Sequence, residues 1–245
     1  MCRLMERLNT IAASDAPVLV VGETGTGKQL IARAVHDRSR REGERFVAID
    51  CASLRDSALE AARGGTLLLD EVGDMSPTVQ LRLLRLLHEH SMDVRVIAAT
   101  HRDLAKLTEA GLFDAGLYRR LSVLDIDVPP LRARRGDLPL LTQYFLNRFH
   151  RPGSRPARMS PAAWSALSAF GFPGNVRQLA RAIEHASVLA AGGALELRHL
   201  PAAIGAALAD IEISVTTVQT LEVATPIPAA SGSTPQARFQ RLMRA

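Results

Sequence analysis

Aromatic residues and cysteines are scarce in this sequence of 245 residues. Phe, Trp and Tyr together make up 4% of the chain, although apolar residues of all kinds reach 47%. The core must therefore be built mostly from Leu, Val, Ile and Ala. The only cysteines, Cys2 and Cys51, have no metal-binding spacing, and two thiols do not make a disulfide framework. This favours a reducing compartment, so we expect a cytoplasmic protein.

Two kinds of apolar segment are also missing. The sequence has no run of about 20 apolar residues, the length that a helix needs to cross a bilayer. Residues 1–16 carry charges at Arg3, Glu6 and Arg7 and lack the apolar region of a signal peptide. We therefore expect neither a transmembrane helix, and hence no membrane partner, nor a secretory leader.

The chain is basic, with a formal net charge of +5. Arginines cluster at residues 38–41, 132–135 and 148–158. Such clusters can contact nucleic acid or another acidic partner, or they can form an ordinary solvated surface, and charge alone leaves both interpretations open. None is interleaved with aromatic residues in the manner of a base-stacking surface.

The first half of the chain alternates strand-like and helix-like patterns. Short apolar runs predict strands at residues 17–21, 46–49, 66–69, 94–99 and 123–128, and helical patterns cover 28–40 and 76–89. Strands that alternate with helices favour a parallel, layered α/β sheet. We assign this domain to residues 1–136.

The second half has a different organisation. Helical patterns alone cover residues 138–150, 160–170 and 175–190, which predicts a small all-helical domain over 137–206. Residues 226–235 have the composition of a linker, so we expect a flexible tail over 207–245.

The segment Gly22–Lys28 reads GETGTGK and fits G-x-x-x-x-G-K between a predicted strand and a predicted helix. In that setting the backbone N–H groups and the helix N-terminus surround phosphates, and Lys28 neutralises the β- and γ-phosphate oxygens. The motif predicts ATP binding. Gln29 stands where a Ser or Thr normally provides a hydroxyl ligand to Mg²⁺, so the metal must depend on water and on carboxylates further along the chain.

Those carboxylates follow the apolar run TLLL as the pair Asp70-Glu71. A strand end in a P-loop protein places such a pair beside the phosphates. We expect both to serve the Mg²⁺ ion, Asp70 through water, and we expect Glu71 to polarise the water that attacks ATP.

Five ordered segments resemble one protein family. They are GETGTGKQLIARAVH, GGTLLLDEVGDMSPTVQLRLLRLL, VRVIAATHRDL, YRRL followed by VPPLRARRGDLPLL, and FPGNVRQLARAIEHA. Together they resemble the AAA+ domain of bacterial enhancer-binding proteins, the ATPases that activate the sigma-54 form of RNA polymerase. The resemblance covers residues 1–205. It implies an AAA+ P-loop NTPase with a sheet between helices and a helical lid, a homo-oligomeric ring of hexamer or heptamer type, and RNA polymerase or a regulator protein as partner.

The resemblance also implies roles for individual residues. Thr100 and His101 occupy the sensor I position, Arg177 the sensor II position, and Arg120 the position of an arginine offered to a neighbouring subunit. Asp70 and Glu71 form Walker B. The nucleotide-binding residues that it implies are Gly22, Glu23, Thr24, Gly25, Thr26, Gly27, Lys28, Gln29 and Arg177, and the catalytic ones are Glu71, Thr100 and Arg120.

One departure from the family is a deletion. Members of the family carry a long helical insertion with a GAFTGA loop that grips sigma-54. Here only the eight residues 55–62 separate Cys51-Ala-Ser-Leu54 from Arg63. So short a segment cannot project the loop and return to the next strand, so we expect that this chain cannot remodel sigma-54.

Three substitutions lie at positions that the family uses for hydrolysis. His101 replaces an Asn in sensor I, Asp50 replaces an Asn that couples to the catalytic glutamate, and Asp114 replaces an arginine of the subunit interface. An acid at position 50 is expected to repel Glu71. These changes predict an ATP-binding regulator with weak or no hydrolysis.

Two alternatives stay open. A competent ring ATPase would use Arg119 or Arg120 as its trans-acting arginine and act on another partner. An inactive fragment of a longer regulator would have no activity of its own. The regulatory domain and the helix-turn-helix of the family are not evident, and residues 236–245 are too few for a DNA-binding domain. The histidines show no metal spacing, and apart from His101 they are expected to be surface or capping residues.

Overall fold

The computed structural model describes residues 2–51, 60–88, 93–149 and 158–206. The described chain forms two units, the first ending at Pro130 and the second beginning at Leu131. Residues 131–137, which lie around the expected domain boundary, form two 3-10 turns, η3 (Leu131–Ala133) and η4 (Arg135–Asp137). No helix within the described ranges has the length and apolarity to span a membrane. The expected tail over 207–245 lies outside the described residues.

Within the described residues, five strands form one parallel sheet in the order β2-β3-β4-β1-β5. The strands are β1 (Val18–Val21), β2 (Phe46–Asp50), β3 (Thr66–Asp70), β4 (Arg95–Thr100) and β5 (Leu124–Asp127). Every predicted strand is present, which confirms the parallel α/β interpretation. In a parallel sheet all strands end at the same edge, so the residues that follow β1, β3 and β4 are neighbours.

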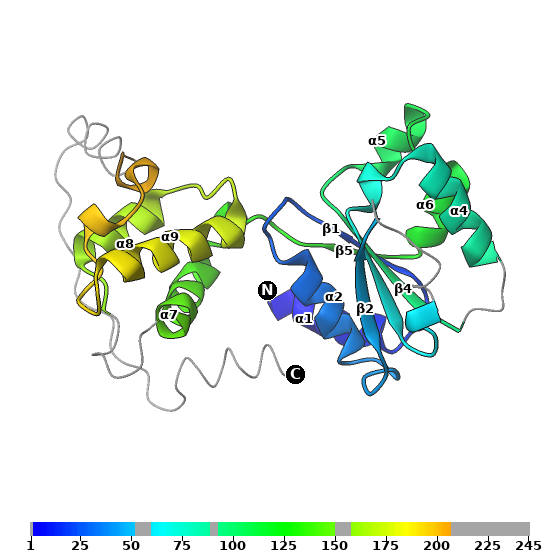
Figure 1. Ribbon diagram of the computed structural model, residues 1–245, viewed down its shortest axis with the longest axis horizontal. Coiled ribbons are helices and arrows are strands. Elements are labelled where there is room, and N and C mark those ends of the chain that lie inside the picture. The colour runs from blue at the N-terminus through cyan, green and yellow to red at the C-terminus, as the bar shows by residue number, and fades with distance from the viewer. Residues whose placement is uncertain (1, 52–59, 89–92, 150–157, 207–245) are drawn as a thin grey trace. The chain divides into compact units, whose positions relative to one another are not determined.

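Helices cover both faces of this sheet (Figure 1). They are α1 (Cys2–Ala12) and α2 (Lys28–His36) on one face, and α4 (Pro77–His88), α5 (Leu104–Glu109) and α6 (Ala115–Leu121) on the other. Successive side chains of a strand point to opposite faces. Leu68 therefore packs with Ile31 and Val35 of α2, whereas Leu67 and Leu69 pack with the core on the opposite face. Both faces need apolar residues, which explains the unbroken TLLL run.

The helices of this unit differ from the prediction in two ways. Helix α2 ends at His36 and not near Arg40, and the chain continues in turns through residue 44. Helices α5 and α6 have no counterpart in the prediction, because elements of six and seven residues are too short to show a helical period. Both begin at aspartate caps: the Asp103 carboxylate accepts from Lys106 N–H at 3.2 Å and that of Asp114 from Leu117 N–H at 2.7 Å.

The second unit is all-helical and has its own core. It contains α7 (Leu138–Arg148), α8 (Pro161–Ala169), α9 (Asn175–Leu189) and the 3-10 turn η5 (Leu197–His199). Leu146, Leu167 and Ile183 are buried together in this core. Asn175 begins α9 with a φ of 52° and is fully buried, and its side-chain oxygen accepts a 2.8 Å hydrogen bond from Leu131 N–H. This bond fixes the start of α9 to the first residue of the unit.

Arg95 is buried at the amino end of β4, with 1% of its surface exposed. Its guanidinium donates to the backbone oxygens of Ala12 at 3.1 Å and Ile11 at 2.9 Å. These carbonyls close the last turn of α1, where a cation is favoured by the helix dipole and by the unpaired C=O groups. Arg95 therefore attaches α1 to the sheet.

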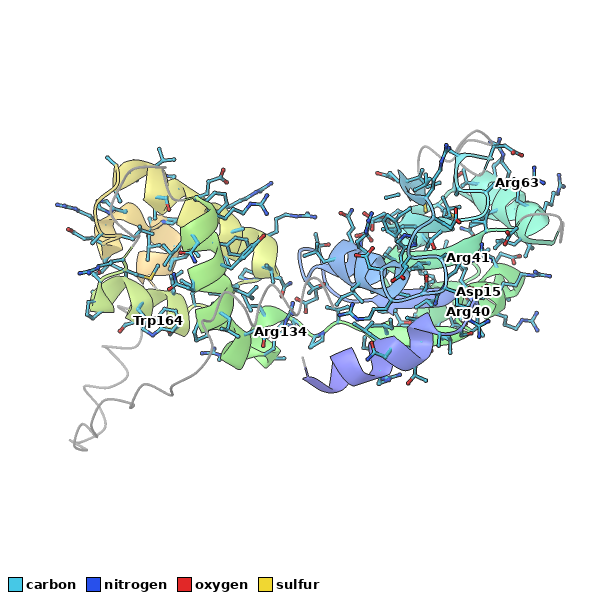
Figure 2. The ribbon with its side chains drawn as sticks, turned by 90° about the horizontal axis from the view of Figure 1, so that it is seen from below. Asp15, Arg40, Arg41, Arg63, Arg134 and Trp164 are labelled. Atoms are coloured by element: carbon cyan, nitrogen blue, oxygen red, sulfur yellow. The ribbon has the colours of Figure 1, made fainter. Side chains whose placement is uncertain are left out.

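Arg41 performs a related task in the turns after α2. Its guanidinium pairs with Asp15 at 3.2 Å and Asp93 at 2.7 Å and donates to the backbone oxygen of Gly64 at 3.1 Å. Figure 2 shows Arg41, Asp15 and Arg40 close together on the α/β unit. At least this member of the 38–41 cluster is therefore a structural cross-link. That leaves less of the cluster for an acidic partner.

His36 is neither of the surface nor of the capping type expected from the sequence. The ring is fully buried, lies 5.2 Å from the Phe46 ring between centroids, and places Nδ1 2.9 Å from Thr66 Oγ1. Burial lowers the pKa of His36, and the neighbouring Arg33 lowers it further. This burial was not predicted, because His36 is the last residue of α2 and no sequence pattern there distinguishes a buried ring from an exposed one.

Candidate functional site

The loop Gly22–Lys28 connects β1 to α2 at the carboxyl edge of the sheet. Gly27 has a φ of 100°, a conformation that residues with a Cβ rarely adopt. Gly22 lies so close to β5 that a Cβ there would be 2.7 Å from Val128 O. The two glycines therefore serve different needs, one for backbone conformation and one for close packing. Thr26 Oγ1 closes the loop by donating to Glu23 O at 2.7 Å.

Lys28 is the first residue of α2, and only 6% of it is exposed. Its ammonium donates to Gly22 O at 3.0 Å and pairs with Glu71 Oε1 at 3.2 Å. The side chain therefore folds back over the loop and reaches the end of β3. A phosphate bound in the loop would meet this ammonium directly.

The acidic pair lies at the end of β3, as the sequence predicts. Asp70 is the last residue of the strand, and its Oδ2 accepts from Gln29 Nε2 at 2.6 Å. Gln29 thus uses its amide on the carboxylate that is expected to hold Mg²⁺ through water. Asp50, at the end of β2, lies in register beside Asp70.

Glu71 adopts a left-handed backbone conformation, with φ 55° and ψ 51°. This conformation costs a residue with a Cβ about 1–3 kcal/mol, and such residues cluster at functional sites. It is held by the 3-10 turn η2 (Val72–Asp74), whose Asp74 N–H donates to Glu71 O at 3.0 Å.

The Glu71 carboxylate is held by His101, the residue that directly follows the neighbouring strand β4. The backbone N–H of His101 lies 3.1 Å from Glu71 Oε2, and the ring Nδ1 lies 2.7 Å from the same oxygen. Partial burial raises the pKa of Glu71, but the His101 hydrogen bonds and the Lys28 ammonium outweigh it and hold this pKa below its usual value. Glu71 is therefore an ionised carboxylate with donors on both oxygens.

Thr100 and Arg102 flank His101 and are fixed by other contacts. Thr100 is fully buried, and its Oγ1 accepts from Arg102 N–H at 3.0 Å. The Arg102 guanidinium donates to Gly73 O at 2.9 Å and pairs with Asp74 at 3.2 Å. Sequence reasoning missed Asp74 and Arg102, although Asp74 is the third acidic residue of the DEVGD segment that contains the predicted pair.

Glu71, Asp74 and His101 each offer a ligand atom, and these atoms lie within 4.8 Å of one another. The spacing permits a metal ion. In this structure, however, Lys28 pairs with Glu71 and Arg102 pairs with Asp74. The arrangement is therefore an alternating network of charges at the strand ends.

The structure brings most predicted site residues together but not all of them. The P-loop, Gln29, Asp70, Glu71 and Thr100 converge at the carboxyl edge. Arg120, on α6, donates from Nη1 to Leu87 O at 2.8 Å. Arg177 is exposed in the first turn of α9 and belongs to the helical unit.

Cys51, next to Asp50, is buried, and that burial raises the pKa of its thiol. A thiol in this state is not a nucleophile at neutral pH. Cys51 therefore serves as a packing residue beside the site.

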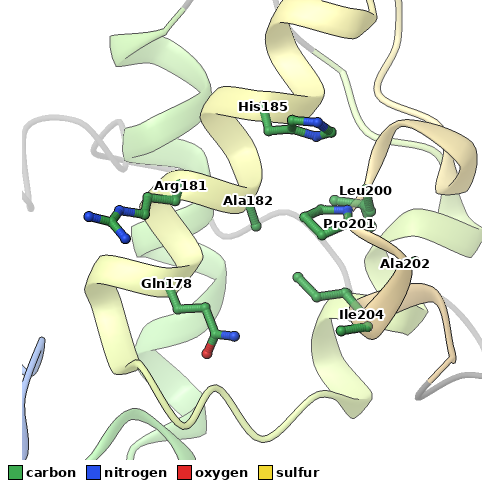
Figure 3. A pocket seen from close by; sticks show the side chains of 9 residues that line it. Gln178, Arg181, Ala182, His185, Leu200, Pro201, Ala202 and Ile204 are labelled. Carbon is green, nitrogen blue, oxygen red and sulfur yellow. The ribbon is translucent and has the colours of Figure 1, made fainter.

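The helical unit contains a separate pocket of about 480 Å³ between α9 and the segment after η5 (Figure 3). Arg181 and His185 provide polar groups, and Leu200 and Ile204 form part of the apolar wall. None of the predicted site residues lines it.

The fold and the site define the class of protein. A parallel sheet between helices, a P-loop after β1, an acidic pair after β3 and a helical lid unit together make an AAA+ P-loop NTPase. Residues 1–131 match the sigma-54 interaction domain family, and residues 132–212 match the AAA+ ATPase lid domain family. This chain belongs to the sigma-54 interaction domain family.

Similar proteins include transcriptional regulators and one solved regulator structure. The transcriptional regulatory protein ZraR of Klebsiella oxytoca is 42% identical over 243 residues, which cover 84% of this chain and 55% of that protein. A Nif-specific regulatory protein of Sinorhizobium fredii is 38% identical over 222 residues, covering 77% of this chain and 37% of that protein. The crystal structure of NtrX from Brucella abortus in complex with ATP has a TM-score of 0.77 and 32% identity, covering 83% of this chain and 55% of that one. This chain spans about half the length of the ZraR relatives.

Proposed function

We propose that this chain is the ATP-binding AAA+ part of a transcriptional regulator, that it turns ATP over slowly or not at all, and that it does not remodel sigma-54. The observation that carries the proposal is the convergence of Lys28, Asp70 and Glu71 at the strand ends. The similar NtrX structure in complex with ATP supports the choice of ligand.

ATP binding would rearrange the site in a defined order. The triphosphate would lie against the loop N–H groups and draw the Lys28 ammonium away from Gly22 O and Glu71. Asp70 would hold Mg²⁺ through water once Gln29 releases its carboxylate. Glu71 would then accept a hydrogen bond from the attacking water. Thr100 and Arg177 are proposed to sense the γ-phosphate from the sheet and the lid.

The proposal on sigma-54 rests on the short segment between β2 and β3. Residues 52–59, which include most of it, lie outside the described residues. The alignment with the Klebsiella ZraR runs over 243 positions but uses only 84% of this chain, so the relative holds tens of additional residues inside the matched region. That difference supports a missing insertion, and with it the missing GAFTGA loop.

Weak hydrolysis is supported by the groups around the proposed interface arginines. Asp114 stands at the first arginine position and uses its carboxylate to cap α6. Arg120 donates to a backbone oxygen of its own subunit. A trans-acting arginine can raise turnover by about 10³-fold or more. Turnover is therefore lower when this arginine is replaced, as at Asp114, or when it binds within its own subunit, as Arg120 does. We propose a homo-oligomeric ring in the cytoplasm, with RNA polymerase or a regulator protein as partner.

A competent ring ATPase is the second candidate. It is favoured by the Lys28–Glu71 pair and by the exposed Arg119, whose Nε donates to Ala115 O. In that case Arg119 is the arginine offered to the neighbouring subunit, and the ring acts on a partner other than sigma-54.

ATP affinity and ATP turnover, measured over a range of protein concentrations, test these functions together. Binding without turnover, abolished by Lys28→Ala and kept by Lys106→Ala, supports the proposal. Turnover that rises with concentration and is lost in Glu71→Gln supports the second candidate. Activation of a sigma-54 promoter in vitro by this chain would contradict the proposal.

A further inference from the structure

Two donors of one residue hold a single oxygen of the proposed catalytic carboxylate. Glu71 Oε2 lies 3.1 Å from the His101 backbone nitrogen and 2.7 Å from His101 Nδ1. A carboxylate only accepts hydrogen bonds, so the ring nitrogen that faces it carries a proton. His101 therefore binds Glu71 with both its backbone and its side chain.

The other carboxylate oxygen is bound by a group that phosphate can take away. Lys28 contacts Oε1 at 3.2 Å and lies at the start of the helix that follows the phosphate loop. A bound triphosphate competes for this ammonium with a larger negative charge. His101 comes from β4 and not from the phosphate loop, so ATP binding gives no comparable reason for it to leave Oε2.

The backbones of both partners are fixed, so the contact between Nδ1 and Oε2 breaks only when the side chain of His101 or of Glu71 rotates. Thr100 is buried before His101, and Arg102 after it is held by Gly73 O and Asp74. The Glu71 backbone is held in its left-handed conformation by η2. The side chain of His101 is 39% exposed, which leaves space for it to turn outward.

We propose that His101 is a positioning residue that holds Glu71 away from the attacking water and thereby limits ATP turnover without affecting ATP binding. This inference rests on the proposed nucleotide site. Two features then contribute to slow hydrolysis. One is the contact between His101 and Glu71, and the other is the altered interface arginine. Because the contact acts on Glu71 and not on the phosphates, its effect falls on kcat and leaves KM unchanged.

The test compares His101→Ala with His101→Asn by steady-state turnover and by the affinity for a fluorescent ATP analogue. The Ala variant removes the side-chain donor and should raise kcat about tenfold, the scale of a hydrogen bond to a charged group. KM and the affinity should stay within about twofold of the unmodified chain. The Asn variant keeps a donor near the Nδ1 position and should give a kcat between the two.

Two controls separate this role from a structural one. His185→Ala removes an exposed histidine of the helical unit and should leave kcat unchanged. In a Glu71→Gln background, His101→Ala should no longer raise turnover, because the carboxylate on which it acts is absent. An increase that persists in that background would overturn the proposal.

The results also distinguish this inference from the proposed function. A kcat of His101→Ala that equals or falls below that of the unmodified chain, with ATP affinity intact, overturns the role of His101 and leaves nucleotide binding standing. Failure of the unmodified chain to bind the analogue contradicts the proposed function itself, and the role of His101 fails with it. If the unmodified chain shows no turnover, its appearance in His101→Ala supports the inference and its continued absence overturns it.

Discussion

The two edges of the sheet use charged side chains in opposite ways. At the amino edge Arg95 and Arg41 bind backbone carbonyls and carboxylates outside the predicted nucleotide site. At the carboxyl edge Lys28, Gln29 and His101 bind the carboxylates of Asp70 and Glu71. The first set of contacts holds helix to sheet. The second holds groups that a nucleotide and its metal could claim.

The difference follows from which partners can be exchanged. A backbone carbonyl at the end of α1 cannot leave without unfolding the last turn, so the bond from Arg95 is permanent. A lysine paired with a carboxylate over a phosphate loop can change partners at little cost, because the incoming phosphate replaces the lost charge. Variants at the amino edge should therefore change stability, and variants at the carboxyl edge should change nucleotide binding or turnover.

Replacement of Arg95 should have the largest effect. Arg95→Met keeps much of the volume but removes the guanidinium from both carbonyls, so that Ala12 O loses its Arg95 donor and Ile11 O keeps only the 3.3 Å bond from Ser14 N–H. We expect a cost of about 3 kcal/mol in the free energy of unfolding. Urea denaturation measures this change, and Arg85→Met, at an exposed position of α4, is the matched control. ATP affinity of the folded variant should be unchanged. A loss below 0.5 kcal/mol would contradict a structural role for the amino edge.

Lys28→Ala tests the carboxyl edge. Loss of the ammonium should weaken ATP binding by about 2 kcal/mol, or about 30-fold in Kd, the range of a hydrogen bond to a charged group. Calorimetry or a fluorescent analogue measures the affinity. Lys106→Ala removes an ammonium from an 81% exposed side chain and should bind ATP as the unmodified chain does. Equal affinity of the two variants would rule out Lys28 as a phosphate ligand.

The buried His36 predicts a pH dependence of stability at the amino edge. Its folded-state pKa lies below the unfolded value of about 6.5, so the unfolded chain binds the proton more readily. Stability is therefore full above that value and falls as the pH drops through it, with a slope of at most about 1.4 kcal/mol per pH unit for one proton. Urea denaturation at pH 7.5 and 5.5 measures this slope.

His36→Gln should make the slope smaller, whereas the exposed His185→Gln should not. An unchanged slope in His36→Gln would show that another group titrates in this range. The pH dependence of stability could then not be assigned to His36 at the amino edge.

The smallest effect is expected at Asp114, which belongs to neither edge. Asp114→Ala removes the acceptor for Leu117 N–H and should lower the free energy of unfolding by about 1 kcal/mol. Asp114→Asn keeps an acceptor at the cap and should stay close to the unmodified chain. Thermal unfolding of both variants checks the prediction. Equal stability of the Ala and Asn variants would show that Asp114 does not serve as a cap.

The sequence predicted the parts of the fold that have a strong local pattern. Apolar runs located all five strands, and the helical pattern over 160–170 located α8, where Ser160 Oγ accepts from Ala163 N–H. Short helices such as α5 escaped, because one and a half turns show no period. The end of α2 was placed too late, since the arginines after His36 are as compatible with a turn as with a helix.

The sequence by itself determined that this protein belongs to the class of P-loop proteins. The spacing from Gly22 to Lys28 and the acidic pair after TLLL depend only on chain order, because a parallel sheet brings consecutive strand ends to one edge. Tertiary structure alone decided what these groups do to each other. That His101 binds Glu71, that Gln29 binds Asp70 and that His36 is buried depend on side chains meeting across strands and helices. Such meetings are set by packing between segments distant in sequence, which no local pattern records.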